Sequence, residues 1–381
     1  MLPRHVYVHV PFCARRCSYC DFSIAVRKNV PAAEYVQGIA RELALRFTVP
    51  ATGSTAATAA TGDWRADTLY LGGGTPSRLG TDGVRALLDT LRSRITLEPG
   101  AEVTIEANPE DVTEAAARAW CDAGITRVSL GAQSFDDAVL RWMHRVHDAQ
   151  AVSRAVHDLR AAGISSLSLD LIFALPESLH RDWQRDLELA LELAPDHLSL
   201  YGLTVEPATP LARWTARGDA AEAPEERYAS EFLLAHDRAT AAGLSHYEVS
   251  NFGRPGAEAR HNASYWSGVP YAGLGPSAHA FDGSTRRWNA APYAEWLRRV
   301  GAGTDPLEGS EQLSADQKVE EAVFLSLRTT AGLVLAEPEW SIAKPWIESG
   351  WARRVGDRVA LTPEGWLRMD AIALTVVRSR L

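Results

Sequence analysis

The sequence predicts an α/β fold: an incomplete barrel of six βα units, followed by a small C-terminal α+β module. Short β-rich runs alternate with helical stretches from residue 1 to about residue 250, and such alternation is typical of parallel βαβ units. Six units are fewer than the eight that close a complete barrel. A helix, a hairpin and a second helix are expected after residue 310. An open, doubly wound sheet is the alternative, since periodicity alone does not distinguish the two.

The expected elements of the barrel follow one another in order. Strands are predicted at Val6–Val10, Asp67–Leu71, Glu102–Ala107, Arg127–Leu130, Ser166–Ile172 and His197–Tyr201. Helices are predicted at about 32–47, 82–94, 111–123, 149–162, 180–193 and 225–242, several with apolar residues at helical spacing. In a partial barrel, residues at the carboxyl ends of the strands converge on one face, where ligands bind.

The chain is expected to divide into three parts. Residues 1–250 would form the barrel, with a flexible surface insertion of low complexity at residues 48–66. Residues 251–310 are interpreted as a connecting segment that carries the run His-Asn-Ala-Ser-Tyr-Trp. Residues 311–381 are expected to form a winged-helix-like domain.

Local signals support this C-terminal domain. Ser314 and Gln317 have the spacing of a capping box at the start of a helix that runs to about Arg328. Gly356-Asp357 predicts the turn of a hairpin over residues 353–361. Thr362-Pro363 predicts the start of another helix, with proline at its first position.

Composition restricts the classes of function. The 381 residues are 46% hydrophobic and 23% charged, with a formal net charge of −9, which argues against nucleic acid as a bulk partner. No apolar run approaches the roughly 18 residues that span a bilayer, so an integral membrane protein is not expected. The first residues lack the pattern of a secretory signal, and the few cysteines suit a reducing compartment. The expected location is cytoplasmic.

Three of the four cysteines fall within eight residues. Cys13, Cys17 and Cys20 have the spacing C-x-x-x-C-x-x-C, and Cys121 is about a hundred positions away. Soft thiolates bind zinc, copper(I) or iron–sulfur clusters. A closed zinc site needs four ligands, whereas an iron–sulfur cubane held by three cysteines leaves one iron open. A zinc site with His9 as the fourth ligand is the local alternative; incidental burial is less plausible, and three cysteines cannot all pair as disulfides.

Polar and glycine residues follow several of the expected strands. A glycine run ending in Gly73, Gly74 and Thr75 follows the second strand and would let the backbone approach a ligand closely. Other candidates for ligand contacts at strand ends or in the following loops are Glu106, Gln133, Arg145 and Asp170. Taken singly, each could equally be a turn glycine, a solvated charge or a surface arginine on a helix.

The cysteine loop and the glycine run together resemble the radical S-adenosylmethionine (SAM) superfamily, in particular its oxygen-independent coproporphyrinogen III oxidase-like family. The resemblance extends from Tyr7 to the C-terminal module. It implies a [4Fe–4S] cluster held by Cys13, Cys17 and Cys20, with SAM on the fourth iron. It also implies SAM contacts from Tyr7, Tyr19, Gly73, Gly74, Thr75, Glu106, Gln133, Arg145, Asp170 and Thr204.

One departure from the family pattern favours a particular branch. Members that oxidise coproporphyrinogen III carry a further cysteine where this chain has Phe22. The ending Cys-Asp-Phe and the run His261-Asn-Ala-Ser-Tyr265-Trp266 instead resemble the heme chaperone branch called HemW. That resemblance implies heme binding and delivery to heme-requiring proteins, membrane-associated respiratory proteins among them.

Two questions about heme and SAM stay open at this level. His261 is the candidate heme ligand, because imidazole is a common ligand of heme iron, but it could equally serve packing. The histidines that could replace it as ligand are His5, His9, His144, His147 and His279. SAM could be cleaved during function or could have a structural or gating role.

Two rival functions remain beside the heme chaperone. One is an enzyme: oxidative decarboxylation of coproporphyrinogen III, or a related radical reaction on a tetrapyrrole. The other is a zinc-stabilised binding module without cluster chemistry. The heme chaperone and the oxidase would share the residues of the cysteine loop and the strand ends. Phe22 therefore provides most of the distinction between these two functions.

Overall fold

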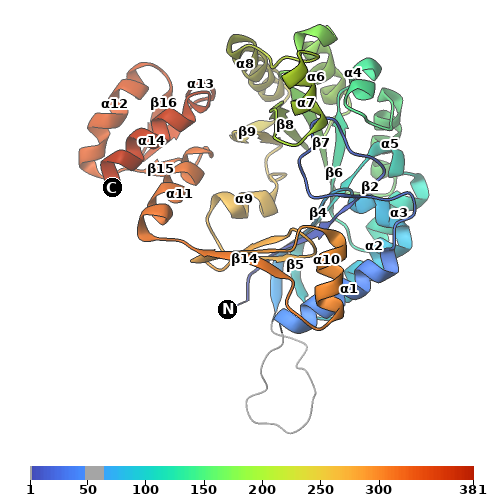
Figure 1. Cartoon of the computed structure of the whole chain (residues 1–381). Helices are drawn as coiled ribbons and strands as arrows, with labels where there is room; N and C mark the ends of the chain where they lie inside the picture. The colour runs from blue at the N-terminus through green and yellow to red at the C-terminus, as the bar shows by residue number, and fades with distance from the viewer. Residues whose placement is uncertain (1, 48–63) are drawn as a thin grey trace, which may run out of the picture.

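A computed structural model describes residues 2–47 and 64–381, and its centre is a curved sheet of twelve strands (Figure 1). The six predicted strands are all present, adjacent and parallel in the predicted order. They are β1 (His5–Val10), β4 (Arg65–Gly73), β5 (Thr96–Ala107), β6 (Arg127–Gln133), β7 (Ser166–Phe173) and β8 (His197–Gly202). The two edges of the sheet, β14 and β9, do not pair with each other, so the barrel is open as expected.

The face of these strands that packs against the helices forms the core. Val128, Leu130 and Leu169, on the adjacent strands β6 and β7, are completely buried. A strand that buries one face carries apolar residues at every second position. This explains why the six runs could be identified in the sequence.

Helices cover the outside of the curved sheet (Figure 1). The six predicted helices correspond to α1 (Ala32–Arg46), α2 (Gly80–Arg92), α3 (Glu114–Asp122), α5 (Ala149–Ala161), α6 (Trp183–Glu192) and α8 (Glu225–Ala241). Both α3 and α6 begin three residues later than expected. The side chains of Thr113 and Asp182 cap them by accepting hydrogen bonds from backbone N–H groups, and such a cap defines where a helix starts.

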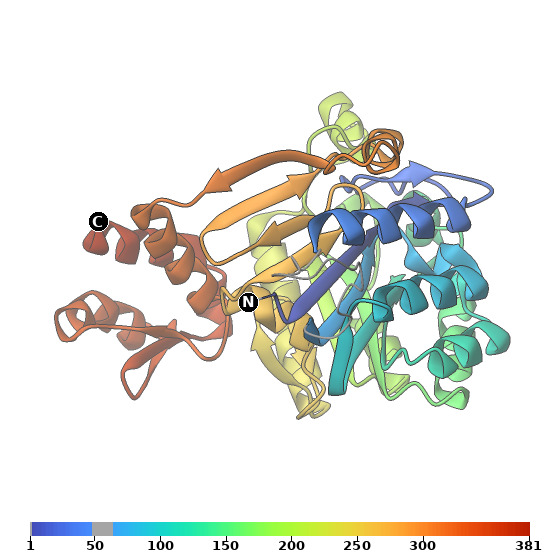
Figure 2. The same ribbon diagram turned by 90° about the horizontal axis from the view of Figure 1, so that it is seen from below.

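The chain after β8 adds strands that the sequence analysis did not predict. β9 (Ser245–Glu248) and β10 (Asn251–Gly253) extend one edge, and β11 (Tyr271–Leu274) pairs in parallel with β1 at the other. β12, β13 and β14 continue from β11 in antiparallel order, and Figure 2 shows them reaching toward the C-terminal end of the chain. Their bounds are His279–Phe281, Thr285–Asn289 and Leu307–Gln312. Residues 251–310 therefore build five strands of the main sheet as well as connecting the two ends of the molecule.

The remaining elements of the main body are short. Four α-helices and two strands lie between or beside the units described above, in addition to single turns of 3-10 helix. They are α4 (Asp137–Trp142), α7 (Pro210–Arg217), α9 (Arg260–Trp266), α10 (Tyr293–Gly301), β2 (Phe12–Cys13) and β3 (Ala25–Val26). In Figure 1, α9 lies on the open side of the sheet, between the barrel and the C-terminal module.

The C-terminal module has the predicted helix, hairpin and helix, with the last helix divided into two and with one more helix and one more strand. The side chain of Ser314 and that of Gln317 form the predicted capping box at the start of the first helix. The elements in order are α11 (Ala315–Leu327), β15 (Leu333–Val334), α12 (Trp340–Glu348), β16 (Ala352–Val355), β17 (Arg358–Leu361), α13 (Pro363–Trp366) and α14 (Met369–Arg380). The three strands form a sheet of their own. The likeness to a winged helix and the three domain boundaries stay predictions.

The predicted insertion at residues 48–66 lies mostly outside the described residues, and its last two residues already belong to β4. In the described part of the chain, no helix combines the length and the apolar character needed to cross a bilayer.

Candidate functional site

The loop that carries the three clustered cysteines is held at its base and at its middle. Cys13 ends β2, which pairs in parallel with β3, so the two ends of the loop are joined. The N–H of Ser18 donates to the carbonyl of Met143 at 3.1 Å. The guanidinium of Arg15 donates to the carbonyl of His144. These contacts fix the loop against the segment that follows α4.

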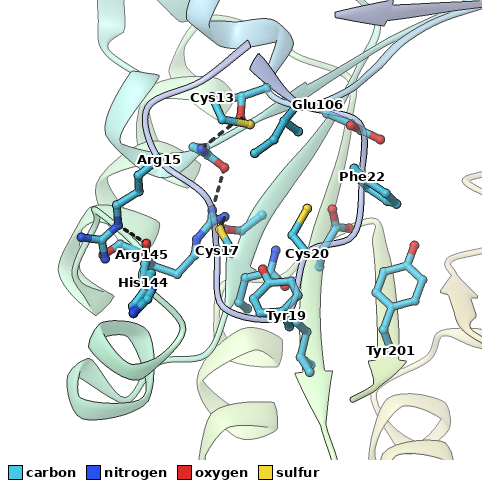
Figure 3. Close-up of a pocket in the computed structure, with 18 of the residues that line it drawn as sticks. Cys13, Arg15, Cys17, Tyr19, Cys20, Phe22, Glu106, His144, Arg145 and Tyr201 are labelled. Carbon is cyan, nitrogen blue, oxygen red and sulfur yellow. Dashed lines mark hydrogen bonds between the residues drawn. The ribbon is translucent and has the colours of Figure 1, made fainter. Parts of the chain in front are cut away.

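The three cysteines line one cavity of about 430 Å³, which we call the cysteine cavity. Figure 3 shows them on one loop around this space, with Glu106 and Arg145 nearby. With the exception of Tyr7, every residue predicted to bind the cluster or SAM lines it: Cys13, Cys17, Tyr19, Cys20, Gly73, Gly74, Thr75, Glu106, Gln133, Arg145, Asp170 and Thr204. The structure thus brings together residues from the cysteine loop and from the ends of five strands.

The cysteine thiols are free and have polar neighbours. The Sγ of Cys13 lies 3.4 Å from the hydroxyl of Thr75, and the Nη1 of Arg145 lies 3.6 Å from the Sγ of Cys17. Burial raises the pKa of Cys13, and burial raises the pKa of Cys20 to about 11. Because the thiolate is the form that binds metal, the guanidinium of Arg145 provides a positive charge where a thiolate would form.

Arg145 is fixed by two further contacts. Its Nη2 donates to the side-chain oxygen of Asn108 at 2.6 Å and to the carbonyl of Gly131 at 2.8 Å. Its Nε is buried and has no hydrogen-bond partner in residues 2–47 and 64–381. Buried donors are normally paired, so the orphaned donor fits a site that is completed by a bound acceptor.

The glycine run brings backbone close to the cavity in conformations that other residues adopt poorly. Gly73 has φ +112°, and a Cβ added there would lie 2.6 Å from the imidazole of His9. A Cβ on Gly74 would lie 2.7 Å from the backbone of Pro11. Only glycine therefore fits both positions.

Two buried carboxyl groups line the cavity at the strand ends. Glu106 accepts hydrogen bonds from the hydroxyl of Tyr70 at 2.8 Å and from the N–H of Gly73 at 2.9 Å. Burial raises the pKa of Glu106 to about 7. Asp170 accepts from the hydroxyl of Ser129 at 2.9 Å, and burial raises its pKa as well. Each carboxyl group retains acceptor capacity for the hydroxyl groups of a ligand.

Gln133 reaches the cavity through an irregularity in β6. The register between β6 and β7 shifts between Leu130 and Gln133, and Gln133 has φ +66°. A bulge of this kind redirects a side chain and is common beside functional sites. The strained backbone supports a functional reason for Gln133 at this position.

The sequence analysis missed Asn108 and Glu110, which also line the cavity. Asn108 links Arg145 to Thr75, whose hydroxyl lies 3.5 Å from the Nδ2 of Asn108. Glu110 contacts His147 at 3.3 Å. Both follow β5 directly, so their place at a strand end was the signal that could have identified them.

His9, the proposed fourth ligand of a zinc site, is engaged elsewhere. Its Nδ1 lies 3.1 Å from the hydroxyl of Tyr7, and its Nε2 lies 3.0 Å from the carbonyl of Ser23. Within the described ranges, no three side chains of the types that bind metal are arranged around a single ion position. A cubane does not require that arrangement, since each cysteine binds a different iron.

His261 is buried away from the cysteine cavity. Its Nδ1 lies 2.7 Å from the hydroxyl of Thr68, and its Nε2 lies 2.9 Å from the hydroxyl of Tyr265. Its ring stacks on Tyr70 with centroids 5.0 Å apart. Burial lowers its pKa to about 3, so the ring is neutral. Both nitrogens that could bind heme iron are occupied by protein groups.

A second cavity of about 560 Å³ adjoins the first, and we call it the aromatic cavity. It lies between the end of the cysteine loop, α9, the extension strands β11–β13 and α11. Six aromatic side chains line it: Tyr7, Phe22, Tyr265, Trp266, Tyr271 and Phe281. Tyr7, predicted to contact SAM, lines this cavity, which shares Gly73 and Glu106 with the cysteine cavity.

Comparisons with known proteins agree with this architecture. The model of the radical SAM superfamily matches residues 7–190, which include the cysteine loop and five of the six predicted strands. The heme chaperone HemW of Mycobacterium tuberculosis is 38% identical, with 98% of this chain and 95% of that protein covered. HemW of Bacillus subtilis is 31% identical, with 87% and 84% covered.

A solved structure shares the fold. Coproporphyrinogen III oxidase (HemN) from Escherichia coli aligns with a TM-score of 0.78 and covers 98% of this chain and 89% of its own, at 22% identity. The open parallel barrel and the cysteine cavity define a radical SAM protein. The similarity over the full length is more specific, and the chain belongs to the HemW family.

The cofactors of this class fit the residues present. Three unpaired thiols on one loop can bind three irons of a [4Fe–4S] cluster and leave the fourth open. The glycine backbone, the buried carboxyl groups and the partly unpaired arginine provide the polar groups that an amino acid joined to a nucleoside requires.

Proposed function

We propose that this protein is a heme chaperone, which binds heme and delivers it to heme-requiring proteins, and that it carries a [4Fe–4S] cluster and SAM. The observation that carries this proposal is the 31–38% identity to HemW proteins over 87–98% of the chain. The cysteine cavity supports the cofactor part independently, because it gathers twelve of the thirteen predicted cluster and SAM residues.

Each group in the cysteine cavity has a part in holding the cofactors. Cys13, Cys17 and Cys20 would bind the cluster, and Arg145 would offset the negative charge of the thiolates. The backbone at Gly73 and Gly74 would approach SAM closely, while Glu106 and Asp170 would accept hydrogen bonds from its hydroxyl groups. When bound, the cluster and SAM supply one-electron redox chemistry.

We also propose the acceptors and the location. The acceptors would be heme-requiring proteins, membrane-associated respiratory proteins among them, and the protein would work in the cytoplasm without nucleic acid as a partner. The net charge of −9 and the small number of cysteines support these two proposals on partner and compartment.

The rival function is oxidation of coproporphyrinogen III, which the common fold with HemN favours. Phe22 weighs against it, because the oxidising members carry a cysteine there. Phe22 is 57% exposed between the two cavities and offers no ligand to iron or sulfur.

One reconstituted sample distinguishes the two functions. The full chain, loaded with iron and sulfide without oxygen, is incubated with coproporphyrinogen III, SAM and a reductant, and a second portion is titrated with heme. We expect one heme per chain and no protoporphyrinogen. Formation of protoporphyrinogen would overturn the proposal, and so would a colourless protein that holds zinc in place of iron.

A further inference from the structure

The aromatic cavity offers a flat ligand apolar surface and one arginine that could bind an acidic group. Its volume of about 560 Å³ falls within the range of roughly 300–1,000 Å³ that is typical of ligand sites. Aromatic rings from the cysteine loop, α9 and the extension strands line it, and such rings present flat apolar surfaces to a ligand. Polar and charged side chains share the lining with these rings: His9, Asp21, Ser23, Glu106, Ser277, His279, Arg286 and Glu321.

Three histidines lie in or beside this cavity, and they differ in the state of their ring nitrogens. Both nitrogens of His9 and both nitrogens of His261 lie within 3.1 Å of protein partners. No hydrogen-bond partner occupies a ring nitrogen of His279 in the described parts of the chain. The ring of His279 stacks on Trp288, with centroids 5.9 Å apart and planes at 24°, which restricts its orientation.

The imidazole of His279 is in the form that binds metal. Burial and the nearby charge of Arg286 lower its pKa, so the ring is neutral at pH 7 and has a free lone pair. Since its side chain is exposed on the cavity wall, a ligand can reach it without rearrangement of the core.

Arg286 provides the complementary charge for a carboxylate. It forms an ion pair with Glu321 of α11 at 2.6 Å, and its guanidinium lies over the ring of Phe281. A guanidinium has five N–H donors, so one carboxylate partner leaves donors for another. Both Arg286 and Glu321 are partly exposed at the cavity, where a ligand carboxylate would compete with Glu321.

Phe22 lines both cavities. The residue is 57% exposed, so its ring is accessible to a ligand in either cavity. Phe22 follows the third cysteine by two residues, so it ties the wall of the aromatic cavity to the loop that would hold the cluster.

We propose that heme binds in the aromatic cavity, with His279 as an axial ligand of its iron and Arg286 as the partner of a propionate. This inference rests on the proposed heme chaperone function and adds the site. It assigns the His-Asn-Ala-Ser-Tyr-Trp motif a supporting role: His261 holds Tyr265, and Tyr265 and Trp266 form part of the wall.

The first test separates iron ligation from cavity shape. The cluster-loaded full chain is titrated with heme and, separately, with metal-free protoporphyrin, and the Soret band is recorded. We expect His279→Ala to weaken heme binding by about tenfold or more and to shift the Soret band. Binding of the metal-free porphyrin should not change. His157→Ala, an exposed histidine on α5 away from both cavities, is the matched control and should change neither.

Each failure of this test has a distinct meaning. If His279→Ala binds heme with the wild-type affinity and spectrum, the inference is wrong while the proposed function stands. Equal weakening for heme and for the metal-free porphyrin would also overturn it, since the role of His279 would then be structural. If the wild-type chain binds no heme, the proposed function itself fails.

The second test uses the ion pair between Arg286 and Glu321. Arg286→Gln and Glu321→Gln both remove the pair, so a purely structural pair would make both variants bind heme more weakly. The proposal expects opposite signs: Arg286→Gln weakens binding, and Glu321→Gln strengthens it because the competing carboxylate is gone. Weakening in both variants would contradict the role of Arg286.

Discussion

The cysteine cavity and the aromatic cavity share one wall but differ in how their polar groups are held. In the cysteine cavity, the side chains of Arg145, Glu106 and Asp170 form hydrogen bonds with Asn108, Gly73 and Ser129 of neighbouring segments. In the aromatic cavity, His279 and Arg286 keep unused binding capacity and are partly exposed. The first arrangement suits a resident cofactor in a fixed position, and the second suits a cargo that binds and leaves.

The largest expected effect is loss of the cluster iron from the cysteine cavity, which the aromatic cavity does not bind. Cys17→Ala removes one of three ligands from the cluster, so bound iron should fall from about four per chain to nearly none. Cys121→Ala is the matched control, because that cysteine lies on α3 outside both cavities. Iron analysis and the visible spectrum measure the change. Full iron content in the Cys17 variant would break the comparison, since the loop would then not be the cluster site.

The next largest effect, on stability and SAM binding, is expected at Gly73, which lines both cavities. Gly73→Ala forces a Cβ to within 2.6 Å of His9 at φ +112°, so we expect a loss of about 3 kcal/mol in the free energy of unfolding and loss of SAM binding. Gly218→Ala is the control: it has φ +79° with nothing within 4 Å of a Cβ, and it should cost only about 1 kcal/mol. Urea unfolding compares them. Equal costs for the two variants would show that close approach at Gly73 does not matter.

A third prediction tests whether His261 is structural. His261→Gln should lose about 2 kcal/mol of stability at pH 7, because it breaks hydrogen bonds of a buried group, and it should still show the histidine-ligated heme spectrum.

The pH dependence of the His261 variant has a definite sign. The folded-state pKa of His261 is lowered to about 3. The wild type therefore has its full stability advantage over the His261→Gln variant above pH 6.5. The difference in the free energy of unfolding then falls by roughly 1.4 kcal/mol per pH unit at most as the pH drops toward 3. Unfolding at pH 7, 6 and 5 measures it. If the difference in stability between the wild type and the His261→Gln variant grew at low pH, His261 would not be a buried neutral imidazole.

The smallest expected effect is a loss of heme affinity on substitution of Phe22, which lines both cavities. Phe22→Ala removes one ring that would pack on the porphyrin, and an aromatic contact is worth about 1 kcal/mol, so heme affinity should fall about fivefold. SAM affinity should change less, since polar groups dominate its site. Titrations with heme and with SAM measure both affinities. A larger loss of affinity for SAM than for heme would show that Phe22 serves the cysteine cavity and not the aromatic cavity.

Sequence reasoning was most successful where the information is local. The strand Ser166–Phe173 is buried on both faces and is a continuous β-rich run, so it could be recognised. The carboxyl ends of parallel strands meet at one edge, so strand-end positions made Glu106, Gln133 and Asp170 candidates, and the resemblance to the radical SAM family supplied the full set. Tyr7 lines the neighbouring cavity, so its contact with SAM stays a prediction, because alternation along β1 does not reveal which ligand lies there.

The aromatic cavity could not be predicted because distant segments build it. β11 has four residues and pairs with β1 across more than 260 positions, which leaves no local signal. Likewise, nothing in the sequence shows that protein groups contact both ring nitrogens of His261 and leave those of His279 available. That difference depends on which ring nitrogens the folded chain has already used.

The central claim is that the chain holds SAM and heme in separate cavities, and their simultaneous binding tests it most directly. The cluster-loaded wild-type chain is saturated with SAM and titrated with heme, with the Soret band as the readout. The account predicts one heme per chain at an affinity close to that measured without SAM. Release of heme by SAM in proportion to its binding would contradict it, because both ligands would then occupy one site.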